Sequence, residues 1–100
     1  MDPEFADRGV THLLPFHIQA RTELFKYMKS VDFYHLDRHP TFSVDEILVV
    51  WAAKVLKNWK CILITTLPDK TIFEVTFNGD TKEIYIDAYQ KFDNVLIKED

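Results

Sequence analysis

Residues 71–87 read TIFEVTFNGDTKEIYID, and this stretch decides the fold class. On both sides of Asn78 and Gly79, apolar side chains alternate with polar ones, which is the pattern of half-buried strands. An Asn-Gly pair between two such runs is a strong signal for a β-hairpin. One face of this hairpin would hold its apolar side chains, which are Phe73, Val75, Phe77, Ile84 and Ile86.

The turn of this hairpin allows two registers. A two-residue turn would set Glu74 opposite Glu83, and like charges in that position destabilise a pair of strands. A four-residue loop at 78–81 would instead set Thr76 opposite Glu83 and Glu74 opposite Tyr85. We expect the longer loop, and both registers keep the same side chains on the apolar face.

Another strand is predicted ahead of the hairpin, over residues 59–66. These residues are rich in β-formers and almost continuously apolar, which indicates a central strand buried on both faces. The Leu-Pro-Asp-Lys run at 67–70 is typical of a turn and would connect this strand to the hairpin. Residues 95–97 could add a short edge strand, so the sequence predicts a meander of three or four strands.

The first of two predicted helices begins after Leu14 and ends near Ser30. Pro15 would lie in its first turn, where the missing N–H costs nothing. Apolar residues at roughly helical spacing would form the buried face of this helix: Ile18, Leu24, Phe25, Met28 and Val31.

The second predicted helix begins with a capping box at residues 43–46, in which Ser43 and Glu46 cap each other's backbone. The apolar run that follows at 47–53 is typical of a helix buried on several sides. A strand over residues 47–51 is the rival interpretation, but the capping box and two alanines favour a helix. Trp51 and Trp59 are both expected in the core.

The predicted fold is therefore α+β, with two N-terminal helices packed on one face of a three- or four-stranded antiparallel β-meander. One hundred residues allow one domain, which we assign to residues 11–100. The first five residues resemble a vector linker, and we expect a vector-derived or disordered leader over residues 1–10. The sequence shows neither a secretory signal nor an apolar run that could span a bilayer, so we expect a cytoplasmic protein without membrane contact.

The net charge of −4 comes entirely from residues 71–100, which hold seven acids and three bases. Nucleic-acid binders gain most of their affinity by neutralising phosphates, so this composition disfavours nucleic acid as a partner. The one basic cluster is Lys54, Lys57 and Lys60, which would lie along one side of the second helix. We expect this stripe to be solvated, and a nucleic-acid-associated accessory protein is the alternative that it allows.

We find no arrangement of residues that predicts an enzyme, a cofactor or a metal site. His35 and His39 have zinc-ligand spacing, but no cysteine is near them and Pro40 follows directly. Cys61 lies within an apolar strand, where cysteine behaves as a small hydrophobe. Two glycines in the whole chain exclude a glycine-rich phosphate loop.

The polar face of the hairpin is the candidate partner-binding site, and it is formed by Glu74, Thr76, Glu83, Tyr85 and Asp87. Tyrosine supplies contact area at low entropy cost, and carboxylates speed the encounter with a basic surface. One alternative is a solvated face without function. A divalent cation is disfavoured, because hard cations require six or more oxygen ligands.

Four stretches carry a resemblance to a known family: residues 49–60 (VVWAAKVLKNWK), 65–66, 74–80 (EVTFNGD) and 85–95 (YIDAYQKFDNV). They resemble a small family of unknown function that is encoded in phages and prophages of low-GC Gram-positive bacteria. The similarity covers residues 43–97 well. The family has no assigned activity, so the resemblance implies origin, namely a cytoplasmic early-gene product of a phage, and no catalytic residues.

These observations lead to one functional prediction. We expect a small phage-encoded module that binds a host or phage protein through its acidic sheet face and modulates that protein. A homodimer is also open, because a short sheet has exposed edges that a second copy can cover.

Overall fold

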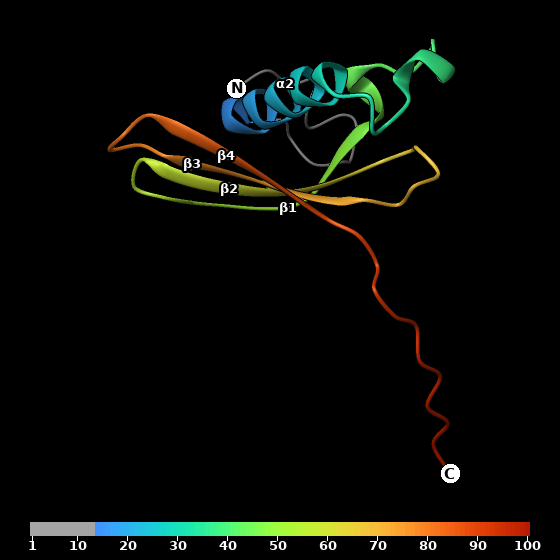
Figure 1. The fold of residues 1–100 in the computed structure, drawn as a ribbon. Coiled ribbons are helices and arrows are strands. Elements are labelled where there is room, and N and C mark those ends of the chain that lie inside the picture. The colour runs from blue at the N-terminus through green and yellow to red at the C-terminus, as the bar shows by residue number, and fades with distance from the viewer. Residues whose placement is uncertain (1–13) are drawn as a thin grey trace, which may run out of the picture.

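Four antiparallel strands form one sheet in the order β1-β2-β3-β4, and a helix lies on one face of this sheet. The computed structural model describes residues 14–100; the expected leader at 1–10 lies outside them. The elements are α2 (Pro15–Ser30), β1 (Ile47–Val55), β2 (Asn58–Thr65), β3 (Ile72–Asn78) and β4 (Glu83–Tyr89). Figure 1 shows α2 above the sheet, whereas no described helix covers the opposite face.

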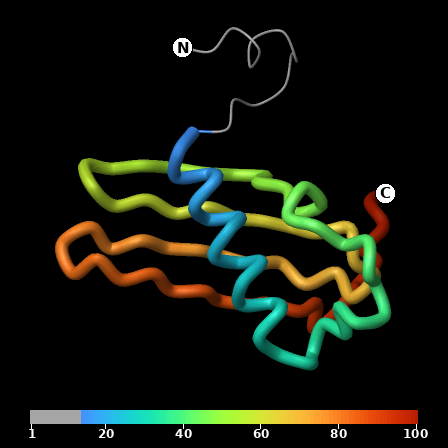
Figure 2. The backbone as a smooth tube through the Cα atoms, turned by 90° about the horizontal axis from the view of Figure 1, so that it is seen from above, coloured from blue at the N-terminus to red at the C-terminus, as the bar shows by residue number. Residues whose placement is uncertain are grey.

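The helix α2 has the bounds that its proline and its periodicity predict. Its buried residues are His17, Ala20, Leu24 and Met28, which follow one another at helical spacing. Ile18 lies one position off this stripe and is half-exposed, so its expected place in the core is wrong. Figure 2 shows that α2 runs across the strands, from the β1 side at its first turn to the β4 side at its last.

The second predicted helix is wrong, because residues 47–55 form β1. The capping residues are used, since the Ser43 N–H donates to Glu46 Oε2 at 3.0 Å. They close only the short 3₁₀ turn η2 (Val44–Glu46), after which the chain is extended. Four of the nine residues that follow are β-branched, namely Ile47, Val49, Val50 and Val55. Such side chains lose rotamer freedom in a helix and fit a pleated strand.

The sheet consequently has its fourth strand at the N-terminal end of the meander. The strand interpretation of residues 47–51 was correct, and β1 pairs with β2 along its length. Residues 95–97, expected as an added edge strand, pair with no strand of the described chain.

A bulge in β1 decides which face its side chains occupy. The pairing of β1 with β2 shifts between Val49 and Trp51. Beyond the bulge, Ala52 pairs with the buried Cys61 and faces α2, which turns Trp51 to the opposite face. Trp51 is therefore 49% exposed, against expectation, whereas Trp59 is buried as predicted.

The β3–β4 hairpin has a four-residue loop, which begins one residue later than expected. Asn78 pairs with Glu83, so the loop covers residues 79–82. The Asn78 side-chain oxygen accepts hydrogen bonds from the N–H groups of Asp80 at 2.9 Å and Thr81 at 3.3 Å. This local bonding of asparagine to the backbone two and three residues ahead sets the start of the turn.

The predicted register is consequently wrong by two residues. Glu74 lies opposite Asp87 rather than Tyr85, and Thr76 lies opposite Tyr85 rather than Glu83. Because side chains alternate with a period of two, an even shift leaves each of them on its predicted face.

The core lies between α2 and the sheet. Its buried residues are Ala20, Leu24, Met28, Tyr34, Ile47, Trp59, Cys61, Leu63, Leu67, Phe73 and Val75. The irregular connection at 31–46, which includes the 3₁₀ turn η1 (Leu36–Arg38), contributes Tyr34. The Tyr34 ring packs on Phe73 with ring centroids 5.6 Å apart, so this connection closes one end of the core.

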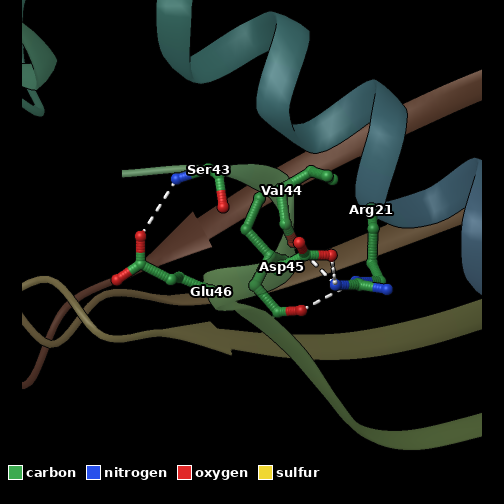
Figure 3. A network of polar contacts seen from close by, with 6 residues as sticks. Arg21, Ser43, Val44, Asp45 and Glu46 are labelled. Atoms are coloured by element: carbon green, nitrogen blue, oxygen red, sulfur yellow. Dashed lines mark hydrogen bonds and ion pairs between the residues drawn. The ribbon is translucent and has the colours of Figure 1, made fainter. Parts of the chain in front are cut away.

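Arg21 fastens α2 to the start of β1 (Figure 3). Its Nε donates to the Ile47 carbonyl and its Nη2 to the Val44 carbonyl, both at 2.8 Å. The Asp45 carboxylate lies 3.7 Å from Nη2 but is exposed to water. An exposed ion pair contributes little, so the two carbonyl bonds account for most of this link.

Candidate functional site

We call the sheet face opposite α2 the helix-free face (Figure 1). It carries the side chains that alternate with the buried ones along the strands. On β2 and β3 the even-numbered residues lie on this face, and on β4 the odd-numbered ones do. On β1 it carries Leu48 before the bulge and the odd-numbered residues after it. All five predicted site residues lie on this face: Glu74, Thr76, Glu83, Tyr85 and Asp87. We call this group the acidic end of the helix-free face.

Two carboxylates of the acidic end face each other. Glu74 lies opposite Asp87, and such a pair of like charges destabilises a hairpin. Lys60 on β2 offsets this repulsion, because its Nζ forms an ion pair with Glu74 Oε1 at 3.3 Å. Within residues 14–100, no side-chain hydrogen bond or ion pair engages the exposed Asp87, so its charge is available to a partner.

Tyr85 is the aromatic residue of the acidic end, and it is 52% exposed. Its hydroxyl donates to Glu83 Oε1 at 3.1 Å. This hydrogen bond, together with the charge of Glu83, raises the pKa of the Tyr85 phenol, so the phenol is neutral near pH 7. A tyrosine ring held by a neighbouring carboxylate is the kind of group that protein interfaces favour.

A second part of the helix-free face is apolar, and the sequence reasoning missed it. We call it the apolar end; its residues are Leu48, Trp51, Ile62, Ile64, Ile72 and Tyr89. They are aligned across the sheet, since Leu48 pairs with Ile64, Trp51 with Ile62, and Ile72 with Tyr89. The four that lie on β1, β3 and β4 are between 46% and 50% exposed.

The apolar end was missed because residues 47–53 were assigned to a helix. The continuous apolar run of β2 predicts a central strand, which is confirmed. We expected both faces of this strand to be covered by other parts of the same chain. That same run could have signalled an uncovered apolar surface.

The three lysines of the nucleic-acid alternative do not form a stripe. Since residues 47–55 are a strand, Lys54 pairs with the buried Trp59 on the helix side, whereas Lys60 lies on the helix-free face. Lys57 lies in the β1–β2 turn and forms an ion pair with Asp80 at 2.9 Å. Two of the three charges are therefore paired with carboxylates, and the predicted geometry of the stripe is wrong.

The residues considered for metal or thiol chemistry are His35, His39 and Cys61. His35 has a left-handed backbone (φ 52°) and flanks the 3₁₀ turn η1 with His39, so the two residues do not lie on an α-helix. Cys61 is fully buried, and burial raises the pKa of its thiol to about 11. Among residues 14–100, no three or more His, Cys, Asp or Glu side chains are grouped so that they could hold a metal ion.

Within the described part of the chain, no helix combines the length and the apolarity that crossing a membrane requires.

The model of a family of unknown function, DUF6275, matches residues 18–99. The chain belongs to the DUF6275 family. No curated protein and no solved structure matches the chain.

The DUF6275 match extends over nearly all of α2, all four strands and the segment after β4. Both ends of the helix-free face therefore fall within the family region. The expected membership of a family of unknown function is confirmed, whereas its phage origin stays a prediction.

Proposed function

We propose that this DUF6275 protein is a small protein-interaction module that binds and modulates a host or phage protein through the acidic end of the helix-free face. It would act without a cofactor or enzymatic activity, as a phage-encoded protein in the bacterial cytoplasm. The observation that carries the proposal is the exposure of Tyr85, Glu83 and Asp87 on a sheet face that no helix of residues 14–100 covers.

The charges of this surface define its partner. Three carboxylates and one ammonium group lie close together on β2, β3 and β4, and the ammonium group of Lys60 is already paired. A complementary surface would present arginine or lysine side chains around a small apolar spot that receives Tyr85. Nucleic acids and anionic membranes carry the same sign of charge as this surface, so a protein is the favoured partner.

The phage origin is supported by the resemblance of residues 49–60, 65–66, 74–80 and 85–95 to phage and prophage proteins. Such a protein would act by occupying a surface of a larger protein, which requires no catalytic group. The nucleic-acid alternative has no observation in its favour, because the lysine stripe on which it depended does not form.

The proposal is tested by capture from a bacterial lysate with three baits. The first is the wild-type chain, and the second carries Glu83→Lys with Asp87→Lys. The third, a matched control, carries Asp32→Lys with Asp37→Lys, which makes the same charge change in the exposed connection on the helix side.

A partner retained by the wild type and by the control, but lost from the second bait, is the expected result. Titration of the purified partner should then show binding at least about tenfold weaker for the second bait, which equals about 1.4 kcal/mol. Rising salt should weaken the wild-type complex. Equal binding of the partner by all three baits would overturn the proposal.

A further inference from the structure

We propose that residues 90–100 form an arm that docks on the apolar end of the helix-free face of a second copy of this chain, so that two copies exchange arms in a two-fold dimer. This inference goes beyond the proposed function, since it uses the apolar end and leaves Glu83 and Tyr85 of the acidic end open for another partner.

The arm begins at a fixed point and then leaves the sheet. The Gln90 side chain donates to Thr71 Oγ1 at 3.2 Å, which holds the start of the arm beside β3. After that point the chain runs away from the sheet on the side opposite α2 (Figure 1). Every residue from 90 to 100 is exposed, so the arm has no place in the fold of its own copy.

The composition of the arm is not that of a solvated tail. Four large apolar side chains occur within six residues, and their exposed fractions range from 70% to 100%: Phe92, Val95, Leu96 and Ile97. A run of exposed apolar side chains marks an interaction site, because burial removes this surface from water.

The apolar end of the helix-free face offers a matching surface. Tyr89 belongs to this end and is also the last residue of β4, so the arm departs directly beside it. Four strands at about 4.8 Å spacing span roughly 15 Å, whereas eleven extended residues can reach about 36 Å. One arm is therefore long enough to cross the whole apolar end of another copy.

The area that would be buried fits a stable dimer. A fully exposed aromatic side chain can bury about 150–250 Å², and an aliphatic one somewhat less. Because the apolar side chains of the arm are largely exposed and those of the apolar end about half-exposed, together they offer roughly 1,000 Å² per copy. A stable interface buries about 800 Å² per partner.

A second copy is the occupant that satisfies both surfaces at once. Arm and receiving face belong to the same chain, so a two-fold axis pairs each arm with the other copy's face and closes the assembly. Thr76, Glu83 and Tyr85 of the acidic end lie farther along the strands, toward the β3–β4 loop, and stay uncovered. Glu74 and Asp87 lie in the same row as Ile62 and Trp51 and border the docked arm.

The test is sedimentation equilibrium of the full chain over a wide range of concentrations. The wild type should sediment with the mass of two chains. Phe92→Ser with Leu96→Ser should reduce this to the mass of one chain without changing the far-ultraviolet circular dichroism, since neither side chain packs in its own copy. As a control, Leu56→Ser removes an 88% exposed leucine from the β1–β2 turn and should leave the dimer intact.

A mixing experiment separates exchange between copies from docking within one copy. Ile72→Ser on the apolar end should also yield monomers. An equimolar mixture of this variant with the arm variant should recover dimers, because one arm and one face remain intact. A wild type that is monomeric throughout, an arm variant that dimerises normally, or a mixture that stays monomeric would overturn the proposal.

Discussion

Arg21 is the residue on which the junction of helix and sheet depends most. Its guanidinium is largely buried and donates to the Ile47 carbonyl at the start of β1 and to the Val44 carbonyl in η2. Buried carbonyls that lose a charged donor keep the full cost of their desolvation. The link therefore contributes to stability through two charge-assisted hydrogen bonds, of which the one to Val44 goes to a carbonyl that also accepts the Ile47 N–H.

Replacement of Arg21 by alanine should lower the free energy of unfolding by about 2–3 kcal/mol. Urea denaturation measures this loss. Arg38→Ala, which removes the same group from the exposed turn η1, should change stability by less than about 0.5 kcal/mol. Equal effects of the two substitutions would show that the carbonyl bonds of Arg21 contribute little.

Cys61 makes stability depend on alkaline pH. Its pKa is raised from 9.0 to about 11 by burial, so between these values the folded chain keeps a proton that the unfolded chain loses. Stability should therefore fall as pH rises from 9 to 11, by at most about 1.4 kcal/mol per pH unit from this group. Urea midpoints across this range should fall less steeply for Cys61→Ala.

The same burial should make the thiol inert in the folded protein near pH 8. A disulfide reagent should label Cys61 only as the chain unfolds, because the thiolate is the reactive form. Labelling of the folded chain at the rate of the unfolded chain would contradict the buried position.

Single polar residues predicted local geometry well. Ser43 with Glu46, and Asn78 at the hairpin, each bond the backbone within a few residues, so their effect can be inferred from sequence. Their reach is equally short. The capping residues could not indicate whether a helix or a strand would follow them. Asn78 could not indicate which residue of β3 would lie opposite which residue of β4.

At the scale of elements, the tips of the two hairpins pack against each other. The Gly79 N–H donates to Asn58 Oδ1 at 2.8 Å, and Lys57 pairs with Asp80 across the same contact. An added Cβ on Gly79 would overlap the Lys57 carbonyl oxygen and lie 2.7 Å from Lys57 Cβ. Glycine is required here by this close approach of two backbones.

Gly79→Ala should therefore destabilise the protein by about 1–3 kcal/mol, because the two turns must separate to admit a methyl group. Thr81→Ala changes an exposed side chain of the same loop and should cost less than about 0.5 kcal/mol. Chemical denaturation of both variants decides the matter, and an unchanged midpoint for Gly79→Ala would mean that the tips do not touch in solution.

The type of an element could be predicted where its apolar residues recur at one regular spacing. The strand β1 has no such spacing. The helix α2, β3 and β4 each follow a regular spacing, so their type and approximate bounds could be inferred. The run at 47–53 has no period, and its bulge removes even the alternation that marks a strand. Pairing with β2 decides its conformation, and pairing is a tertiary interaction that a local pattern does not contain.

At the scale of the whole molecule, one sheet face is covered and the other is divided into two surfaces. The common face of the acidic side chains could be predicted, because alternate residues of a strand lie on the same face of the sheet. The apolar end and the burial of Tyr34 could not, since they depend on which strands lie side by side and on where an irregular connection runs.

Carboxyl footprinting of the protein with its captured partner tests the central claim most directly. In this measurement a carbodiimide and an amine label exposed carboxylates in the free protein and in the complex. We predict that Glu83 and Asp87 become protected in the complex, while Asp32 and Asp37 are labelled as in the free protein. Unchanged labelling of Glu83 and Asp87 in a saturated complex would contradict the account.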